Sequence, residues 1–294
     1  MAEARWRQDQ ATGLRQLMQA RSQRSISLIG GRGRIGKTSL VINLATSLVH
    51  RGNRVLVIDE FNSSGNVAAR LGMRARQRLG DVLRGDAPLE SLVLDAATDL
   101  QILPLSVQPS QLARLDADSE ARFAQQFADL LADVDFLLVD AAPIHSPDQP
   151  SMALATDERL IVLADRAEAI TDAYTFIKLL SRDFAKRDFL LLVNRAPDYT
   201  AAKQLFERVA RVARRHTQAD VRLLGFVPED ETLHRANHLL QPLMPAFADA
   251  EASHACLQLA EVLERLVPVS LTPPDAFVHR WIECNRAFLP SQQP

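Results

Sequence analysis

The sequence is poor in cysteine and has no long apolar run. Its 294 residues contain two cysteines, Cys256 and Cys284, which are too few for a disulfide framework or for a zinc site made of thiolates alone. Acidic residues such as Asp135 and Asp140 interrupt the apolar stretches well before the roughly 20 residues that a membrane-spanning helix needs. The first 20 residues hold no apolar run of signal-peptide length. We therefore expect a cytoplasmic protein.

The sequence also lacks a strong excess of charge of one sign. Its formal net charge is −2, which argues against a protein that works mainly by neutralising nucleic-acid phosphates. Composition alone therefore argues against nucleic acid as a partner. With 47% apolar and 24% charged residues, the chain instead has the composition of a folded globular protein.

Short apolar segments alternate with longer helical patterns along the chain. Segments that are apolar throughout suit parallel strands with helices on both faces. The predicted strands are 25–29, 54–59, 100–105, 136–140, 159–163, 189–194 and 222–227, and the predicted helices include 37–50, 109–132, 171–186 and 200–215. This order predicts one doubly wound α/β domain with a mostly parallel sheet over residues 23–267. An arm (1–22) precedes it and a tail (268–294) follows it.

A glycine-rich segment joins the first predicted strand to the first predicted helix. It reads GGRGRIGKTS over residues 30–39 and fits the phosphate-loop pattern G-x-x-x-x-G-K-[ST]. Glycines let backbone N–H groups surround phosphate oxygens, and the helix N-terminus adds positive potential. We expect Lys37 to reach the β- and γ-phosphates of ATP and Thr38 to bind Mg²⁺. The other expected nucleotide contacts are Gly31, Gly33, Gly36 and Ser39. A glycine-rich turn that binds nothing is the alternative, and the position between strand and helix argues against it.

Two acidic residues end apolar strands near this loop. Asp59 follows Val55–Ile58, and Asp140 follows Phe136–Val139. Carboxylates at the carboxyl ends of parallel strands point into the crevice beside the phosphate loop, where they can hold Mg²⁺ or its waters. Each could instead only cap the helix that follows. We expect Asp59 and Asp140 to join Thr38 at the metal and to join Lys37 in catalysis.

The segment 27–72 resembles the MinD/ParA class of P-loop ATPases, whose loop reads KGGxGKT. Two later segments are similar to that class as well: LVNR at 192–195, and LGFVPED at 224–230. The resemblance implies a MinD-like P-loop fold, ATP and Mg²⁺ as cofactors, and an ATP-dependent homodimer. It also implies that Asn194 reads adenine beside Pro228. Arg32 stands where the class has the lysine that reaches the partner's phosphates, so it is expected to take that catalytic role.

The arm carries a second resemblance. DQATGLR, from Asp9 to Arg15, looks like the DQAxxLR arm of the FlhG family of flagellar-number regulators, also called FleN or YlxH. That family's arm binds the SRP-type GTPase FlhF and stimulates its GTP hydrolysis, and flagellar switch proteins or a transcription activator are implied as further partners. Judged by its residues alone, the arm has one apolar helical face, which is made of Ala11, Leu14, Leu17 and Met18. This face needs a surface to cover it, either on the protein's own domain or on another protein.

Three departures from the class concern ATP hydrolysis. Arg34 replaces a glycine of the loop, and Phe61 replaces the second acid of a D-x-D motif, so the usual group that orients the attacking water is missing. Glu60 is adjacent, and on an extended segment it should point elsewhere. Pro143 stands where an N–H normally meets the γ-phosphate. We expect ATP to bind and to be hydrolysed slowly.

The tail contains an amphipathic segment at 275–289. Phe277, Trp281 and Ile282 recur at helical spacing, with Arg280 and Arg286 between them. Such a helix can lie in a membrane interface, which would place the protein peripherally at the inner face of the cell membrane. The alternative is that the helix packs on its own domain.

These features predict an ATP-binding regulator of flagellar number or placement, an antiactivator and FlhF partner with weak ATP hydrolysis. A ParA-like ATPase that positions DNA or protein cargo is one alternative, and it leaves the arm and the aromatic tail unexplained. A scaffold whose loop binds no nucleotide, because of Arg34, is the other.

Overall fold

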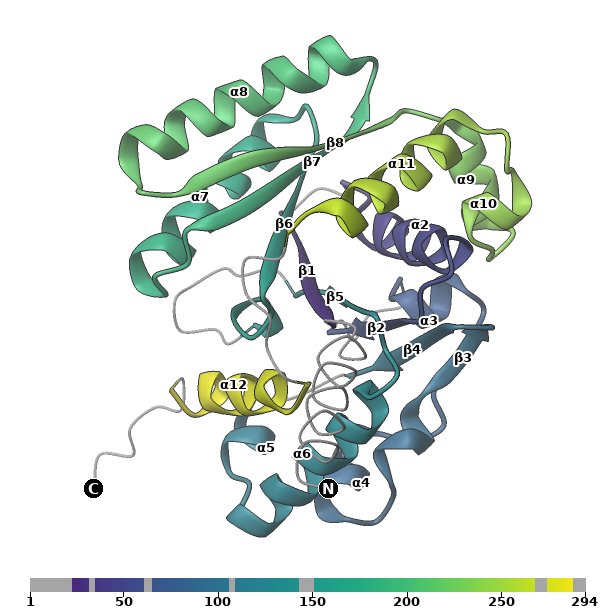
Figure 1. Cartoon of the computed structure of the whole chain (residues 1–294), viewed down its shortest axis with the longest axis vertical. Coiled ribbons are helices and arrows are strands. Elements are labelled where there is room, and N and C mark those ends of the chain that lie inside the picture. Colours follow the sequence, from purple (N-terminus) through teal and green to yellow (C-terminus); the bar gives the residue numbers. More distant parts are fainter. Residues whose placement is uncertain are drawn as a thin grey trace, which may run out of the picture.

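The computed structural model describes residues 23–31, 35–60, 65–105, 109–142, 151–267 and 274–287, and one eight-stranded sheet runs through them (Figure 1). The strand order is β3-β4-β2-β5-β1-β6-β7-β8. Neighbouring strands are parallel except β3 and β4, which are antiparallel. The strands are β1 (Arg24–Gly30), β2 (Val55–Asp59), β3 (Leu94–Ala97), β4 (Leu100–Pro104), β5 (Phe136–Asp140), β6 (Glu158–Leu163), β7 (Asp188–Ala196) and β8 (Asp220–Pro228).

Helices cover both faces of the sheet (Figure 1). The apolar cluster on one face is closed by α2 (Lys37–His50), α3 (Val67–Arg70), α9 (Glu231–His238), α10 (Leu243–Ala246) and α11 (Glu251–Arg265). The cluster on the other face is closed by α4 (Leu79–Arg84), η1 (Leu89–Leu92), α5 (Pro109–Ala113), α6 (Ala117–Leu131), η2 (Met152–Leu154), α7 (Ala167–Asp183), α8 (Tyr199–His216) and α12 (Pro274–Ala287). The sheet thus has a separate core on each side, and the predicted doubly wound α/β fold is confirmed.

The central strands are buried along their whole length because both of their faces meet helices. Every residue of β1, β2, β5 and β6 is buried. This is the burial that uninterrupted apolar runs predict for parallel strands. Helix α6 buries only one of its faces. Phe123, Phe127 and Leu131 recur every four residues along that face, and all three are buried in the core.

The structure contains one strand that was not predicted and divides one predicted helix into two. The strand β3 was not predicted, because its four residues alternate between half-buried and exposed and contain Asp95. The predicted helix 109–132 is two helices, α5 and α6, since Asp116 begins a new one by accepting a hydrogen bond from the Ser119 N–H at 2.7 Å.

The apolar side of α12 is buried against α6 and η2. Phe277, Val278, Trp281 and Ile282 are each at most 2% exposed. The ring centroids of Trp281 and Phe123 are 6.2 Å apart, and those of Phe277 and Phe127 are 5.9 Å apart. At the rim, Arg286 pairs with Glu120 at 2.5 Å. Of the two arrangements that the sequence allowed for this helix, the structure has the one packed on its own domain. No helix in the described part of the chain has the length and apolarity needed to cross a bilayer.

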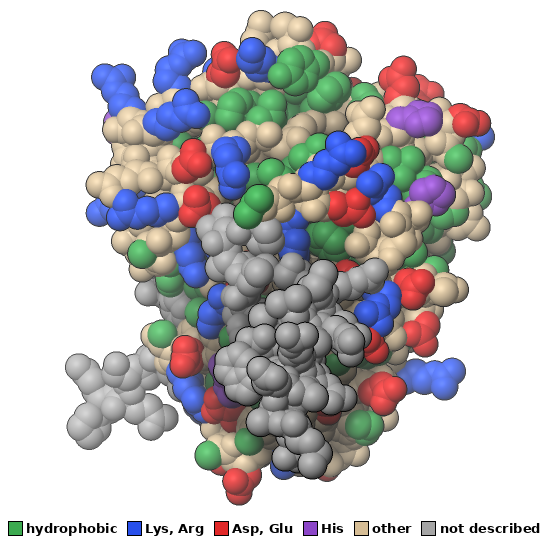
Figure 2. Space-filling model, viewed as in Figure 1, with side chains coloured by type: hydrophobic (Ala, Val, Ile, Leu, Met, Phe, Trp, Pro, Cys, Tyr) green, Lys and Arg blue, Asp and Glu red, His purple; other side chains and the backbone are tan. Residues whose placement is uncertain are grey.

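The exposed side of α8 is basic, and its arginine and lysine side chains appear as blue spheres in the upper left of Figure 2. The exposed basic residues are Lys203, Arg208, Arg211, Arg214 and Arg215. Arg214 and Arg215 lie in the last helical turn, where positive charge offsets the helix dipole.

Candidate functional site

The predicted loop and acids meet at the carboxyl edge of the sheet. Asp59 and Asp140 are the last residues of β2 and β5, and the register pairs them with each other. Both are fully buried. The glycine-rich segment follows β1, the neighbour of β5, so the strands bring residues from three parts of the sequence to one edge.

Asp140 binds both functional side chains at the start of α2. The Lys37 ammonium donates to Asp140 Oδ1 and to the Ala141 carbonyl oxygen, the latter at 2.8 Å. The Thr38 hydroxyl donates to Asp140 Oδ2 at 2.7 Å. A hydroxyl and a carboxylate at this distance form a hard-oxygen pair of the kind Mg²⁺ prefers. Ser39, the next residue, donates from its hydroxyl to Asn237 of α9 at 3.3 Å.

Asp59 is tied to the start of α3. Its Oδ2 accepts a hydrogen bond from the Val67 N–H at 2.6 Å. Asn66 caps the same helix, since its side-chain oxygen accepts from the Ala69 N–H at 2.8 Å. The carboxylate of Asp59 therefore holds the start of α3 against the end of β2.

Asn194 packs directly on the phosphate loop. Its Nδ2 donates to the Ile35 carbonyl oxygen at 2.7 Å. A Cβ placed on Gly36 would lie 2.5 Å from that nitrogen, and Gly36 also has a φ of +85°, so only glycine fits there. Oδ1 of Asn194 is buried and has no hydrogen-bond partner among the described residues. A buried acceptor without a donor is what a ligand N–H, such as an adenine amine, would satisfy.

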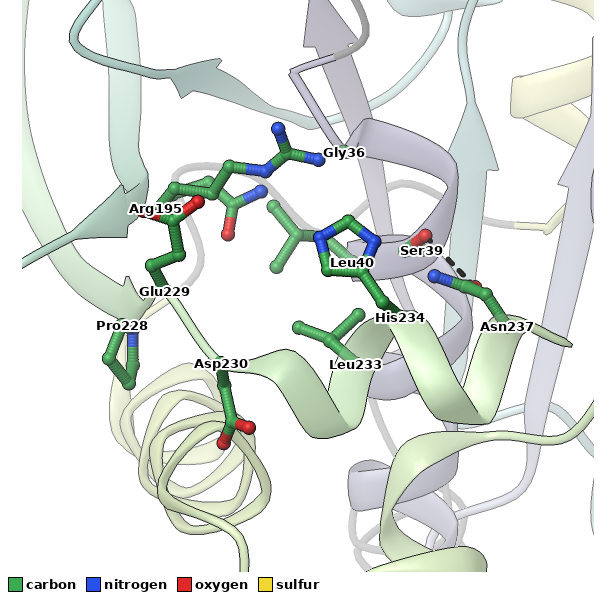
Figure 3. Close-up of a pocket in the computed structure, with 11 residues that line it drawn as sticks. Gly36, Ser39, Leu40, Arg195, Pro228, Glu229, Asp230, Leu233, His234 and Asn237 are labelled. Atoms are coloured by element: carbon green, nitrogen blue, oxygen red, sulfur yellow. Dashed lines mark hydrogen bonds between the residues drawn. The ribbon is translucent and has the colours of Figure 1, made fainter. Parts of the chain in front are cut away.

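A pocket opens beside these residues between α2, the ends of β7 and β8, and α9 (Figure 3). Four of its lining residues were predicted from the sequence: Gly36, Ser39, Asn194 and Pro228. The others are Leu40, Arg195, Glu229, Asp230, Leu233, His234 and Asn237. The α9 members were missed because only the folded chain brings that helix against α2, and the sequence pattern gave no sign of it.

Arg195 occupies a strained backbone position at the pocket. The register between β7 and β8 shifts between Asn194 and Ala196, which leaves Arg195 as the extra residue of a bulge, with a φ of +59°. Bulges of this kind redirect a side chain. Figure 3 shows the Arg195 guanidinium reaching toward Gly36. A positive charge is thereby aimed at the phosphate loop.

Glu60 forms a contact that the sequence did not predict. Its carboxylate accepts from the backbone N–H groups of Ala142 at 2.7 Å and Met152 at 2.9 Å. Burial raises the pKa of Glu60 to about 7, although these two hydrogen bonds and the nearby Lys37 act to lower it. Glu60 therefore holds the chain that follows Asp140.

Asp172 of α7 lies against the start of the phosphate loop. A Cβ placed on Gly31 would come within 2.5 Å of both Cβ and Oδ2 of Asp172. Asp172 is itself buried, at 8% exposure. Its packing means that Gly31 must remain glycine for the loop to keep this path.

Several predicted residues lie outside the described part of the chain. They are Arg32, Gly33, Arg34, Phe61, Pro143 and the arm 1–22. Among the described residues, no cluster of three or more His, Cys, Asp or Glu side chains could hold a metal by itself. A Mg²⁺ ion here would need ligands from Thr38, from nucleotide phosphates and from water. The donor set fits such an ion, because Mg²⁺ keeps several waters and few protein ligands.

The chain is similar to one family model, to two flagellar proteins and to a solved structure of MinD. A model of the family described as "Cellulose biosynthesis protein BcsQ" matches residues 23–263. The chain is 30% identical to the antiactivator FleN of Pseudomonas aeruginosa over 239 residues, and this alignment covers 81% of this chain and 85% of FleN. It is 26% identical over 214 residues to the flagellum site-determining protein YlxH of Helicobacter pylori, or 71% of each chain. The septum site-determining protein MinD of Pyrococcus horikoshii, solved with Mg-ADP, has the same fold (TM-score 0.62, 24% identity, 83% of this chain and 96% of that one).

Proposed function

The chain belongs to the MinD/ParA family of P-loop ATPases, into which both the matching family model and FleN fall, and from this premise we propose that it is an ATP-binding regulator of flagellar number and placement. The similarity to FleN and YlxH, one named as an antiactivator and the other as a flagellum site-determining protein, supports the regulatory part. In this proposal 1–22 is a partner-binding arm, 23–267 is the ATP-binding domain and 268–294 is the tail.

The observation that carries the nucleotide-binding part is the cluster of Lys37, Thr38 and Asp140. Lys37 exchanges Asp140 for the β- and γ-phosphates, and Thr38 with Asp140 holds Mg²⁺ or its waters. Asn194 accepts from the adenine amine through the oxygen that has no other described partner. Bound nucleotide supplies the phosphates, and Mg²⁺ supplies charge neutralisation. Arg32 takes the place of the family's lysine at the phosphates of a second copy in an ATP-dependent homodimer.

Isothermal titration calorimetry with Mg-ATP tests this part. We expect saturable heat for the full chain and its loss in Lys37→Ala, while Lys203→Ala, on the exposed side of α8, binds as the unchanged chain does. Absence of heat with the unchanged chain would contradict nucleotide binding and favour a nucleotide-free scaffold.

Hydrolysis is proposed to be slow. Phe61 cannot orient water and Pro143 offers no N–H, and loss of one such group commonly lowers a rate by about 10²–10⁴-fold. Steady-state phosphate release by the full chain, measured beside an intact MinD-type ATPase, is expected to be lower by a factor in that range. Equal turnover would show that another residue, Glu60 included, replaces the missing acid.

The arm is proposed to bind an FlhF-type GTPase. A peptide of residues 1–22 should raise the GTP hydrolysis of such a protein, and the same peptide with Leu14→Asp should not, because the charge interrupts its apolar face. A flagellar switch protein or transcription activator is proposed as a second partner. Non-specific DNA binding together with no effect of the peptide would instead favour a ParA-like cargo-positioning ATPase.

A further inference from the structure

One carboxylate joins the two ends of the segment between β5 and η2. Glu60 Oε2 accepts from the Ala142 N–H at 2.7 Å, and Oε1 accepts from the Met152 N–H at 2.9 Å. The Ser151 hydroxyl adds a third contact at 3.3 Å. Hydrogen bonds from backbone N–H groups to a carboxylate are stronger than those between neutral groups. Glu60 thus fixes the spacing between residues 142 and 152.

Lys37 holds the same segment one residue earlier. Its ammonium donates to the Ala141 carbonyl oxygen at 2.8 Å, and the following residue, Ala142, is the one bound by Glu60. In the proposed function this ammonium moves to phosphate oxygens when nucleotide binds. Lys37 then has two arrangements, one on Ala141 and one on the ligand, which is the kind of two-state element that coupling requires.

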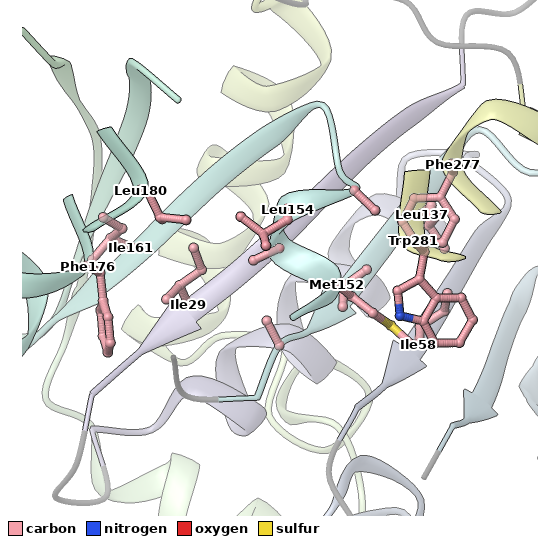
Figure 4. Close-up of a cluster of buried hydrophobic side chains, with 14 of the residues drawn as sticks. Ile29, Ile58, Leu137, Met152, Leu154, Ile161, Phe176, Leu180, Phe277 and Trp281 are labelled. Atoms are coloured by element: carbon pink, nitrogen blue, oxygen red, sulfur yellow. The ribbon is translucent and has the colours of Figure 1, made fainter. Parts of the chain in front are cut away.

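The other end of the Glu60 contact leads to α12. Met152 is the first residue of η2, is fully buried, and belongs to the same apolar cluster as Trp281. Helices η2 and α12 are in contact. Figure 4 shows Met152 reaching toward the Trp281 indole, with Phe277 beside it. A shift of the Met152 backbone therefore changes the surroundings of Trp281.

We propose that Glu60 is a positioning residue that couples nucleotide binding at Lys37 to the packing of α12 on η2. When Lys37 leaves Ala141, the Ala141–Ala142 peptide moves, and Glu60 transmits the displacement to Met152. The proposal rests on the proposed nucleotide binding. Such coupling is reciprocal, so the packing of α12 also biases nucleotide affinity.

Trp281 itself reports the coupling. The chain has two tryptophans, so Trp6→Phe leaves Trp281 as the only one. We expect Mg-ATP to change the emission of Trp281 in this protein. Glu60→Gln should abolish the change, because the two backbone N–H groups bind different oxygens of Glu60 and the amide replaces one of these oxygens by an NH₂ group, which cannot accept. Glu90→Gln, a control at an exposed glutamate of η1, should retain the full change. Glu60→Asp keeps the carboxyl group but is one methylene shorter, and it should lose most of the change.

Calorimetry on the same proteins separates the outcomes. If the Trp6→Phe protein binds no Mg-ATP, the proposed function fails. If it binds Mg-ATP without an emission change, or if Glu60→Gln and Glu60→Asp bind it and keep the full change, the coupling is overturned. If Glu60 only stabilised the fold, its variants would have a lower melting temperature, and Mg-ATP would still change their Trp281 emission in full.

Discussion

Gly31 and Asp172 lie so close that a methyl group does not fit between them. We predict that Gly31→Ala lowers the free energy of unfolding by about 1–3 kcal/mol, the usual cost of overpacking, because the new Cβ would sit 2.5 Å from Asp172. The same change displaces the phosphate loop and should weaken Mg-ATP binding. Urea unfolding and calorimetry measure the two effects.

Gly65→Ala is the matched control for this change. Gly65 has only a distant Arg70 nitrogen, 4.0 Å from a Cβ placed there, and its φ is not positive. It should unfold at the same urea concentration as the unchanged chain or a slightly higher one. Equal behaviour of the two glycine variants would show that α7 can move away from the loop at little cost.

Arg195 and Ala185 share an unfavourable backbone conformation but differ in position. Their φ angles are +59° and +52°, and a non-glycine residue in this region is strained by about 1–2 kcal/mol. Replacing either by glycine should therefore raise stability in urea. Only Arg195→Gly should weaken Mg-ATP binding, because only Arg195 lines the pocket. If both variants bind Mg-ATP as the unchanged chain does, the strain at Arg195 has no part in binding.

Some features of single residues could be predicted from the sequence and others could not. The positions of Lys37, Thr38 and Asp140 were predictable, because a glycine-rich loop and the end of an apolar strand fix them locally. The Glu60 and Asp172 contacts were not. Each depends on which distant segment packs beside it, and a single charged residue, whether it follows a strand as Glu60 does or lies in a helix as Asp172 does, gives no periodic signal.

At the scale of elements, helix α12 contributes an aromatic layer to one core. Trp281→Ala should lower the free energy of unfolding by about 3–5 kcal/mol, as expected for a buried tryptophan that is 2% exposed. Leu239→Ala is the control, since Leu239 is 57% exposed and should change stability by less than about 0.5 kcal/mol. A small effect of Trp281→Ala would show that α12 is detached in solution.

The strands could be predicted more securely than the helices. Runs such as Val55–Ile58 and Phe136–Val139 are apolar throughout, and a parallel sheet covered on both faces is the place that suits such runs. The amphipathic pattern of α12 specified a helix and an apolar face but not what covers that face. A membrane and the aromatic side of α6 satisfy the same pattern, and only the packing of Trp281 with Phe123 and Phe127 distinguishes them.

For the whole molecule, the packing of α12 buries the apolar residues that a lipid interface would need. The residues that would enter a lipid interface, Phe277, Trp281 and Ile282, are the ones buried against the domain. The same side chains cannot contact the domain and a lipid interface at the same time. Membrane association through these residues would therefore require α12 to detach first. We predict that the nucleotide-free Trp6→Phe protein, mixed with vesicles of phosphatidylglycerol and brominated phosphatidylcholine, shows no bromine quenching of Trp281.

A peptide of residues 274–294 provides the positive control, because its apolar face has no domain to cover it. It should insert into the same vesicles and lose Trp281 emission. Quenching of the full protein to the same extent would contradict the prediction and show that the lipid interface competes with α6 for the helix. Quenching that appears only after Mg-ATP is added would instead connect membrane binding to the nucleotide, since coupling through Glu60 lets the ligand loosen α12.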